Sequence, residues 1–506
     1  MMKRKRGSNE KLNGPLEKKG RSRLSPSLQL SDLPMDILYS IVSRLPIREA
    51  VRTSILSKHW KYVWCCRPNL MFTFRSMVYK EGSKVPRPRY SISEHIFIQR
   101  VNAVLEQHTG YGVKKMEVHF SPLNMEHKDH IDRWVRFAIA SKTSQLVLDL
   151  QVQRSTKEPY NFSFQLFDAI SASHLQSLKL CSLSLNQPAN IKVLVNLKKL
   201  ELVDVNITDD ELNKLVLSSC NVLEFIGISR CKLVTSLHAP HHLNHLKHLR
   251  VSHCPLLQRI QLNFSPTTLE YEGSLIPLAP HRTMRNLTIR SMDIFSALGY
   301  IFTKLPSTLP DLEMLTLGCQ ELKRAALPNK LLTFVYLRHL RLELSFVSLR
   351  KRRTTDVLDL ARFLETTPIM EKLEVHMRMG SGLKRYHKGD GELRSLPPHP
   401  HSHLKLVNIT GFYGQKDQLE LALHILRNST VLKTMKIDPR PIREAIIGVI
   451  GSDDSVGCLD GYKVAKKYLR KADHRGLVDI RVSRRDVEIG RHDYLNHELL
   501  NPSWLE

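Results

Sequence analysis

Two groups of histidines are the side chains whose type and spacing could support metal chemistry. They lie in "HHLNHLKH" (His241, His242, His245 and His248) and in "HPHSH" (His399, His401 and His403). Zinc sites usually add cysteine or carboxylate ligands at short, regular spacing, and neither group brings them. Both groups also fall where a loop leads into a strand pattern. We therefore expect solvated loop histidines, with no metal site and no cofactor.

The usual motifs of an active site are also missing from the sequence. There is no glycine-rich phosphate loop ahead of a helix, no His-Glu-x-x-His and no nucleophile elbow. The eight cysteines are scattered without Cys-x-x-Cys pairs, which is typical of free thiols in a reducing compartment. We expect a protein that is not itself an enzyme.

Composition indicates a soluble protein of the nucleus or cytoplasm, or both. The 506 residues are 42% hydrophobic, which is enough for a large core. No apolar run approaches the roughly 18 residues that span a bilayer, and no hydrophobic region follows the basic N-terminus as in a secretory signal. No membrane partner is expected.

The formal net charge of +27 raises the alternative of a basic, nuclear, nucleic-acid-associated protein. Part of this charge lies in a tail, residues 1–29, that is short of apolar residues and should be disordered. Two basic clusters in the tail match a nuclear-localisation signal, although a solvated tail would have the same composition. The candidate residues are Lys3, Arg4, Lys5, Arg6, Lys18 and Lys19.

The stretch "LSDLPMDILYSIVSRLPIREAVRTSILSKHWKYVW" predicts three short helices. Pro34 and Pro46 each stand where a first helical turn would begin, a position that tolerates proline. The apolar residues of the first helix recur at three- and four-residue steps and form one wide stripe. A unit this small buries little surface by itself, so it needs a partner or the rest of a larger domain. Trp60 and Trp64 are expected in its core.

This stretch resembles the F-box in its plant form, from Leu30 to about Phe72 and including the trailing "PNLMF". The resemblance implies docking on the Skp-type adaptor of cullin–RING ubiquitin ligases, and through it contact with cullin and RING subunits. The docking residues that it implies are Leu33, Pro34, Ile37, Leu38, Ile41, Leu45 and Pro46. The alternative is an ordinary buried helical hairpin.

A self-similar pattern follows, with "LQSLKL", "LKKLEL", "LEFIGI" and "LKHLRV" sharing one template. Most repeats begin roughly 22–28 residues apart, which is the spacing of leucine-rich repeats. The leucines at the first, fourth and sixth positions should point into the core from a short strand. Cys231 and Cys254 occupy one equivalent position of two repeats, where they should pack under a turn.

Strand, helix and strand in series predict parallel pairing in an arc with the strands on its concave side. Residues between the inward leucines should point outward, because strand side chains alternate. The candidates for target binding at this position are Lys179, Glu201, Arg250, Arg341 and Glu374. Their mixed signs argue against a groove for a phosphate backbone, so nucleic acid is not the expected partner. Each of them could instead be a solvated strand position.

The segment His401 to Arg440 reads as strand, helix and strand, with Leu419, Ala422, Leu423 and Leu426 as the buried stripe of its helix. It resembles the FBD domain, which ends many plant F-box proteins with leucine-rich repeats. The resemblance implies no chemistry of its own. Such a unit could protect the last strand edge of the repeats.

We therefore expect an α+β protein in which a three-helix F-box precedes an irregular leucine-rich-repeat α/β solenoid capped by an FBD unit. The expected division is tail 1–29, F-box 30–75, repeats 95–400, FBD unit and terminal cap 401–482, and an unassigned tail 483–506. The expected function is recruitment of a target protein to a Skp–cullin–F-box ubiquitin ligase. A non-proteolytic F-box scaffold is a second alternative.

Overall fold

The computed structural model divides the chain into two compact units, Met1–Arg67 and Pro68–Glu506. The residues that it describes are 33–56, 58–78, 90–108, 112–120, 123–150, 157–167, 173–185, 194–219, 222–239, 245–262, 266–278, 284–291, 294–320, 330–346, 356–379, 384–441 and 455–481. The candidate nuclear-localisation residues and the tail 483–506 lie outside these ranges. Among the described residues no helix is long and apolar enough to cross a membrane.

The first unit contains the three predicted helices. They are α1 (Met35–Arg44), α2 (Ile47–Arg52) and α3 (Lys58–Cys65), with a 3-10 turn, η2 (Thr53–Ile55), between the last two. Pro34 and Pro46 stand one residue before α1 and α2, where the missing proline N–H leaves no helical bond unmade. The core residues are Leu38, Val42, Ile47, Ala50, Trp60, Val63 and Trp64. Both tryptophans are buried, as expected.

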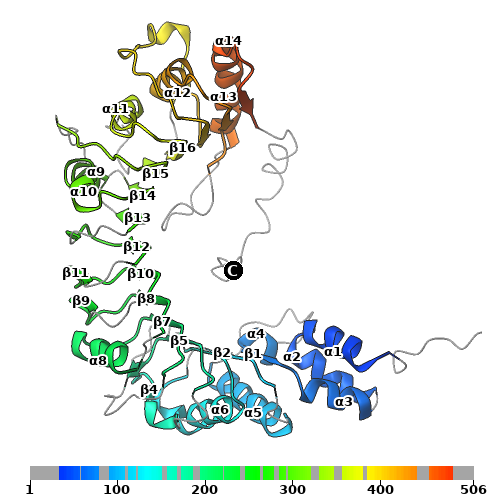
Figure 1. Cartoon of the computed structure of the whole chain (residues 1–506). Coiled ribbons are helices and arrows are strands. Elements are labelled where there is room, and N and C mark those ends of the chain that lie inside the picture. The colour runs from blue at the N-terminus through cyan, green and yellow to red at the C-terminus, as the bar shows by residue number, and fades with distance from the viewer. Residues whose placement is uncertain are drawn as a thin grey trace, which may run out of the picture. The chain divides into compact units, whose positions relative to one another are not determined.

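The second unit is built on one continuous parallel sheet whose strands follow each other in sequence order (Figure 1). Each strand pairs with its neighbours in chain order, so connections never cross. The strands are β1 (Asn69–Thr73), β2 (Lys115–His119), β3 (Gln145–Asp149), β5 (Ser177–Cys181), β7 (Lys199–Val203), β8 (Phe225–Ser229), β10 (His248–Ser252), β12 (Thr268–Glu272), β13 (Asn286–Ser291), β14 (Met314–Gln320), β15 (His339–Phe346), β16 (Lys372–Met379), β17 (Leu406–Thr410), β18 (Thr434–Asp438) and β19 (Val478–Ile480).

The sheet begins earlier than the sequence suggested. Residues 68–75 were expected to close the F-box, and the repeats were expected from residue 95. Instead β1 is the first strand of the sheet and pairs in register with β2. The segment "NLMFT" alternates exposed and buried side chains, which is the pattern of a half-buried strand.

Helices connect the strands, and α8, α9 and α10 lie on one side of the row of strands, opposite the inside of its curve (Figure 1). The longer ones are α5 (Tyr90–Gln107), α6 (Lys128–Ala140), α8 (Asp209–Ser219), α9 (Ile294–Thr303), α12 (Lys416–Asn428) and α13 (Ser455–Val464). The shorter ones are α4 (Phe74–Met77), α10 (Leu305–Thr308), α11 (Ala361–Glu365) and α14 (Arg470–Ala472). Single turns are η3 (Met125–His127), η4 (Phe164–Leu166), η5 (Val357–Leu360), η6 (Lys388–Asp390) and η7 (Ala465–Leu469).

Two short parallel pairs add to the connections. They are β4 (Asn161–Phe162) with β6 (Ser184–Leu185), and β9 (Ser236–Ala239) with β11 (Arg259–Leu262).

Two features recur in the repeats: leucines buried in the interior, and a residue with positive φ directly after several of the strands. Leu175, Leu178 and Leu180 are fully buried, as the template predicted. Asp204, directly after β7, has φ +51°, and its N–H donates to the carbonyl of Ser229 at the end of the next main-sheet strand. Ser182, Arg230 and His253 repeat this geometry. Cys231 and Cys254 are buried just beyond it, which confirms that they are packed under the turn.

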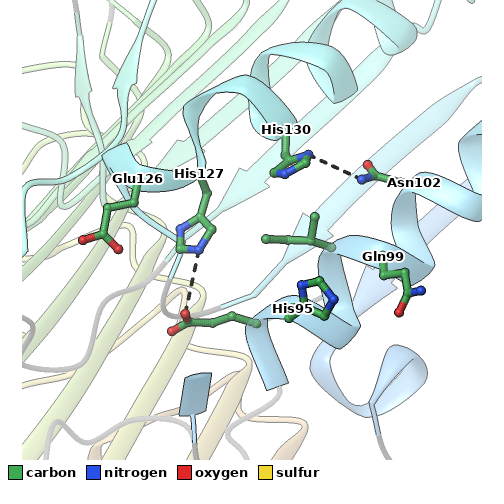
Figure 2. Close-up of a pocket in the computed structure, with 8 residues that line it drawn as sticks. His95, Gln99, Asn102, Glu126, His127 and His130 are labelled. Carbon is green, nitrogen blue, oxygen red and sulfur yellow. Dashed lines mark hydrogen bonds and ion pairs between the residues drawn. The ribbon is translucent and has the colours of Figure 1, made fainter. Parts of the chain in front are cut away.

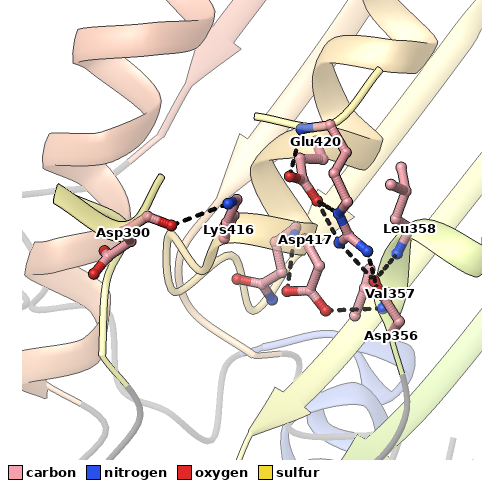
Figure 3. Close-up of polar contacts among 9 residues, drawn as sticks. Asp356, Val357, Leu358, Asp390, Lys416, Asp417 and Glu420 are labelled. Carbon is pink, nitrogen blue, oxygen red and sulfur yellow. Dashed lines mark hydrogen bonds and ion pairs between the residues drawn. The ribbon is translucent and has the colours of Figure 1, made fainter. Parts of the chain in front are cut away.

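The end of the second unit carries the expected strand–helix–strand, β17–α12–β18, whose helix buries the predicted apolar stripe. A segment, residues 384–404, lies between β16 and β17 and is tied to α12 by ionic contacts. Arg394 bonds the carboxylate of Glu420, whose side chain is fully buried, and also bonds Asp356. Figure 3 shows Lys416 donating to the carbonyl of Asp390, and Asp417 accepting from the N–H of Val357.

Candidate functional site

The first unit exposes a set of large apolar side chains. On α1 these are Met35, Ile37 and Ile41, which are each about two-fifths exposed (37–43%). Pro34 and Pro46 are also exposed, while Leu33 and Leu45 are half-buried. Six of the seven residues that the F-box resemblance implied therefore have accessible surface. A small unit that leaves isoleucines in water on one helix has the character of an interaction site.

Leu38 differs from this expectation, because it is only 1% exposed and belongs to the core with Val42. The sequence shows apolar residues at both Ile37 and Leu38, and the stripe is too wide to tell its two halves apart. Packing of α1 against α3 within the unit selects Leu38 and Val42 for burial. Leu38 can thus support the surface from below but presents almost no area to a partner.

Two further exposed residues, Ile55 and Leu56, were not singled out for docking from the sequence. They are 86% and 65% exposed at the end of η2. In the sequence they directly follow the pattern of α2, and an unbroken helix would place Ile55 near the face that carries the buried Ala50. The change from α-helix to 3-10 helix after Arg52 alters the angular step and turns these side chains into solvent.

The second candidate site is the inner face of the sheet, defined here by alternate residues of the strands in three rows. The central row contains all five residues predicted for target binding. Register pairs Lys179 with Glu201, Glu201 with Gly227, and Gly227 with Arg250. The same row continues through Glu270, Thr288 and Thr316 to Arg341 and Glu374. The structure therefore brings the five together on one face, as the alternation of strand side chains implied.

Charges on this face balance, although the chain as a whole is strongly basic. The three rows contain eight lysines and arginines and nine carboxylates. The cations are Lys115, Lys179, Lys199, Arg250, Arg290, Arg341, Lys372 and Lys436; the anions are Glu117, Asp149, Glu201, Glu270, Glu272, Glu343, Glu374, Asp438 and Asp479. The mixed signs predicted from five residues extend over the whole face.

An aromatic ring stands near the middle of the inner face. Phe225 of β8 is half-buried, and the Nζ of Lys199 and the guanidinium of Arg250 lie 5.0 and 5.5 Å from its ring centre. Each cation is also paired with a carboxylate, Lys199 with Glu201 and Arg250 with Glu270, both at 2.6 Å. Burial opposes the ionisation of Glu270, but hydrogen bonds from His248 and Arg250 outweigh it and lower its pKa to about 2.

A second cluster joins β13, β15 and β16. The side chain of Glu343 is fully buried, and it accepts from the Nε of Arg290 at 2.9 Å and from the Nε of Arg341 at 2.8 Å. Glu374 pairs with His339 at 3.1 Å and with Lys372 at 2.9 Å. The hydrogen bond from His339 is the largest influence on Glu374 and lowers its pKa to about 2. Sequence reasoning found Arg341 and Glu374 but missed Arg290 and Glu343.

A third cluster lies at the N-terminal end of the sheet. His119 contacts Glu117 at 3.0 Å and Asp149 at 3.4 Å. Burial favours the neutral imidazole, yet the hydrogen bonds with Asp149 and Glu117 prevail and raise the pKa of His119 to about 9. His119 is therefore a cation at neutral pH and stabilises the two carboxylates beside it.

The histidine groups considered for metal binding do not form a metal site in the described part of the chain, where no three His, Cys, Asp or Glu side chains are placed to hold an ion. His241 and His242 lie outside the described residues. His401 is packed against His399 and His424, and burial lowers the pKa of His401 to about 4. It is a neutral core residue rather than the solvated loop histidine that was expected.

Within the second unit, a cavity of about 390 Å³ lies between α5 and the start of α6. Figure 2 shows His95, Gln99 and Asn102 on one side, with Glu126, His127 and His130 on the other. His130 is already bonded to Asn102, and His127 is paired with Glu94 at 3.8 Å, so these lining side chains already have partners within the protein. We therefore give this cavity no role in the proposed function.

Comparison with known proteins agrees with this architecture. The family model described as "At1g61320/AtMIF1, LRR domain" matches residues 104–481, and the model described as "F-box domain" matches residues 30–70. The F-box/FBD/LRR-repeat protein At1g13570 of Arabidopsis thaliana is 26% identical over 420 residues, which are 81% of this chain and 90% of that protein. The F-box/FBD/LRR-repeat protein At5g56420 of Arabidopsis thaliana is 29% identical over 204 residues, 40% of this chain and 44% of that protein.

A solved structure, the complex of Rad7 and Elc1 in yeast, covers 78% of this chain and 88% of its own at 11% identity. Its TM-score of 0.27 is too low to support a structural argument.

Proposed function

The chain belongs to the At1g61320/AtMIF1 leucine-rich-repeat family and carries an F-box domain, and from this we propose that it is the substrate-recognition subunit of a Skp–cullin–F-box ubiquitin ligase. The first unit docks on a Skp-type adaptor, and through it joins the cullin and RING subunits. The inner face of the repeats holds a target protein. The chain itself performs no chemistry, and it works in the nucleus, the cytoplasm or both.

The observation that carries the docking role is the division of α1 into two faces. Leu38 and Val42 fill the core, while Ile37 and Ile41 remain in water on the other face. Each side chain is about two-fifths exposed, so burying the rest is worth roughly 1 kcal/mol per side chain, out of roughly 1.5–3 kcal/mol for burying a fully exposed one. A partner that covers them recovers this free energy on binding.

The contribution of such a subunit to ubiquitin transfer is proximity. Tethering a target beside the ligase converts a bimolecular encounter into one at roughly millimolar effective concentration. This role needs two separate surfaces on one chain and no catalytic group. The two candidate surfaces lie in different compact units, which supports the proposal.

The test is co-purification of the full chain with a Skp-type adaptor, comparing wild type with Ile37→Asp/Ile41→Asp. Two buried charges in a docking patch should weaken the complex by roughly 2–4 kcal/mol, or at least about thirtyfold in Kd. The matched control is Leu233→Asp/Leu256→Asp, which alters two similarly exposed leucines of the repeats.

Loss of adaptor binding only in the first variant supports the proposal. If wild type fails to bind the adaptor, or if both variants bind equally well, the docking role is wrong. Adaptor binding followed by no ubiquitination of any bound protein would favour the non-proteolytic scaffold.

A further inference from the structure

We propose that the inner face, from β7 to β16, receives an acidic, extended segment of the target protein, with Phe225 and its two flanking cations as the anchor. This inference rests on the proposed function, in which that face holds the target. It adds the chemistry of the segment that is recognised. Three observations lead to it: the depth at which each charge lies, the surroundings of Phe225, and the spacing of the charges.

The first observation is that, from β7 to β16, the carboxylates of this face are less exposed than the lysines and arginines that pair with them. Lys199 is 48% exposed and its partner Glu201 is 18% exposed; Arg250 is 47% exposed and Glu270 27%. In the second cluster the side chain of Arg341 is 30% exposed and that of its partner Glu343 is 0% exposed. Lys372 is 40% exposed and its partner Glu374 is 11% exposed. Long lysine and arginine stems reach past the shorter acidic side chains, which produces this order.

Positive and negative charges on this face are nearly equal in number, but the positive ones are the more exposed. A partner therefore meets positive charge first. Interaction energy falls with distance, so the more exposed cations are the charges that an approaching chain meets first and at the shortest distance. The carboxylates beneath hold each cation in place, which reduces the side-chain entropy lost on binding. Acidic side chains complement such a layer.

The second observation is the surroundings of Phe225. Its strand has glycine at the next inner-face position, Gly227, so no side chain stands there. A Cβ on Gly227 would lie 3.1 Å from the Phe225 ring and 3.3 Å from Glu201, which shows how closely these side chains cover the glycine. The result is a half-buried apolar ring between two cations. An apolar side chain flanked by carboxylates matches this arrangement.

The third observation concerns spacing and excludes a nucleic acid as the favoured occupant. Neighbouring strands are about 4.8 Å apart, and each cation on this face already has a carboxylate or a neutral neighbour. A duplex carries one charge per roughly 1.7 Å and needs a track of uncompensated cations. Each lysine and arginine of this face from β7 to β16 is instead paired with a carboxylate, so the face offers no such track. A peptide with a few acidic residues can instead place each one over a cation.

The experiment measures binding of the full chain to a fluorescein-labelled peptide of alternating glutamate and leucine by fluorescence anisotropy. The comparison probes are the same peptide with lysine in place of glutamate, and labelled oligo-dT. The test variant is Lys199→Glu/Arg250→Glu, with the milder Lys199→Gln/Arg250→Gln as a second. The matched control, Arg133→Glu/Lys157→Glu, makes the same charge change at two cations of equal exposure, 51% and 49%, off the inner face.

We expect the test variant to bind the glutamate peptide about tenfold more weakly, the glutamine variant to be intermediate, and the control to match wild type. The lysine peptide should not bind. Equal losses in the test and control variants would show general attraction to a basic chain and overturn the proposal. Preferential loss of oligo-dT binding in the test variant would assign the face to nucleic acid instead.

Adaptor co-purification of the same variants separates this inference from the proposed function. Both pairs of substitutions lie on the repeats and should leave adaptor recovery unchanged. A variant that recovers adaptor normally and still binds the glutamate peptide like wild type refutes the acidic-segment site alone. Failure of adaptor recovery in wild type refutes the ligase role, whatever the peptide binds.

Discussion

Arg341 donates from Nε to Glu343 at 2.8 Å, although the carboxylate is fully buried and both residues belong to β15. Arg290 reaches the same carboxylate from β13. One buried anion thus orients two guanidinium groups from different repeats and links their strands across β14.

Glu343→Gln should lower the free energy of unfolding by about 2 kcal/mol. Removing one partner of a buried ion pair usually costs roughly 3–5 kcal/mol, and partial exposure of both arginines reduces that figure. Urea unfolding followed by circular dichroism measures the change. Glu224→Gln removes an exposed partner of Lys247 and should leave stability unchanged. Equal effects of the two substitutions would contradict a shared buried anion.

His119 should make the protein less stable as the medium becomes alkaline. Its pKa is raised to about 9 in the folded chain, above roughly 6.5 in the unfolded chain. Its stabilisation is therefore complete below pH 6.5 and is lost as the pH rises through about 9. We expect a loss of about 2 kcal/mol across this window in wild type, and a flatter profile in His119→Gln. Identical profiles would remove His119 as the cause.

On α1, neighbouring residues should separate stability from docking. Leu38→Ala should lower the free energy of unfolding by roughly 2–4 kcal/mol, because it opens a cavity in the small core. Ile37→Ala should change stability by less than about 1 kcal/mol but reduce adaptor recovery. Thermal unfolding and adaptor co-purification of both variants test the pair. Reduced recovery by Leu38→Ala alone, at a temperature where it is folded, would reverse our assignment.

Gly411, which follows β17, should not tolerate a side chain. Its φ is +66°, and an added Cβ would lie 1.7 Å from the carbonyl oxygen of Met377. Gly411→Ala should therefore destabilise the chain by at least about 3 kcal/mol or prevent folding. Gly112 has a similar φ of +70° but open space around it, so Gly112→Ala should cost only about 1 kcal/mol of backbone strain. Soluble yield and the midpoint of urea unfolding compare the two.

Arg394 should control the local stability of the terminal helix α12. Its pKa is raised by the hydrogen bonds to Asp356 and then Glu420, so it stays charged. Arg394→Ala leaves the buried Glu420 with less compensation and should cost about 2 kcal/mol, seen as faster hydrogen exchange over 416–428. Arg440→Ala, at an exposed pair with Asp438, should leave that exchange unchanged. A double change to methionine, Arg394→Met/Glu420→Met, should cost less than the sum of the single changes.

The repeat fold could be predicted because its determinants are local. The leucine template marks each strand, and the period of two assigns Lys179, Glu201 and Arg250 to one face without knowledge of their partners. Partners were harder to predict. Glu343 contacts Arg290, which lies 53 residues earlier in the chain. The repeat lengths are too irregular to align from the sequence, so the strand register that brings these two residues together could not be predicted.

Which side chains are buried within a short element could also not be predicted from the sequence. Ile37 and Leu38 have similar hydrophobicity, and only the position of α3 decides which of them faces the core. His401 was predicted to be a loop residue because its group lies where a loop leads into a strand pattern, yet the ring of His424 on α12 packs against it. In both cases contacts between elements, which no local pattern records, determined the outcome.

The order of strands in the sheet has a consequence for biosynthesis. Every strand from β2 onward is laid against one that precedes it in the chain, so each repeat can join the growing sheet while later residues are still on the ribosome. No strand has to wait for a distant segment. The edge of β16 stays unpaired until β17 emerges, so a nascent chain stalled before residue 401 would expose an unpaired strand to quality control.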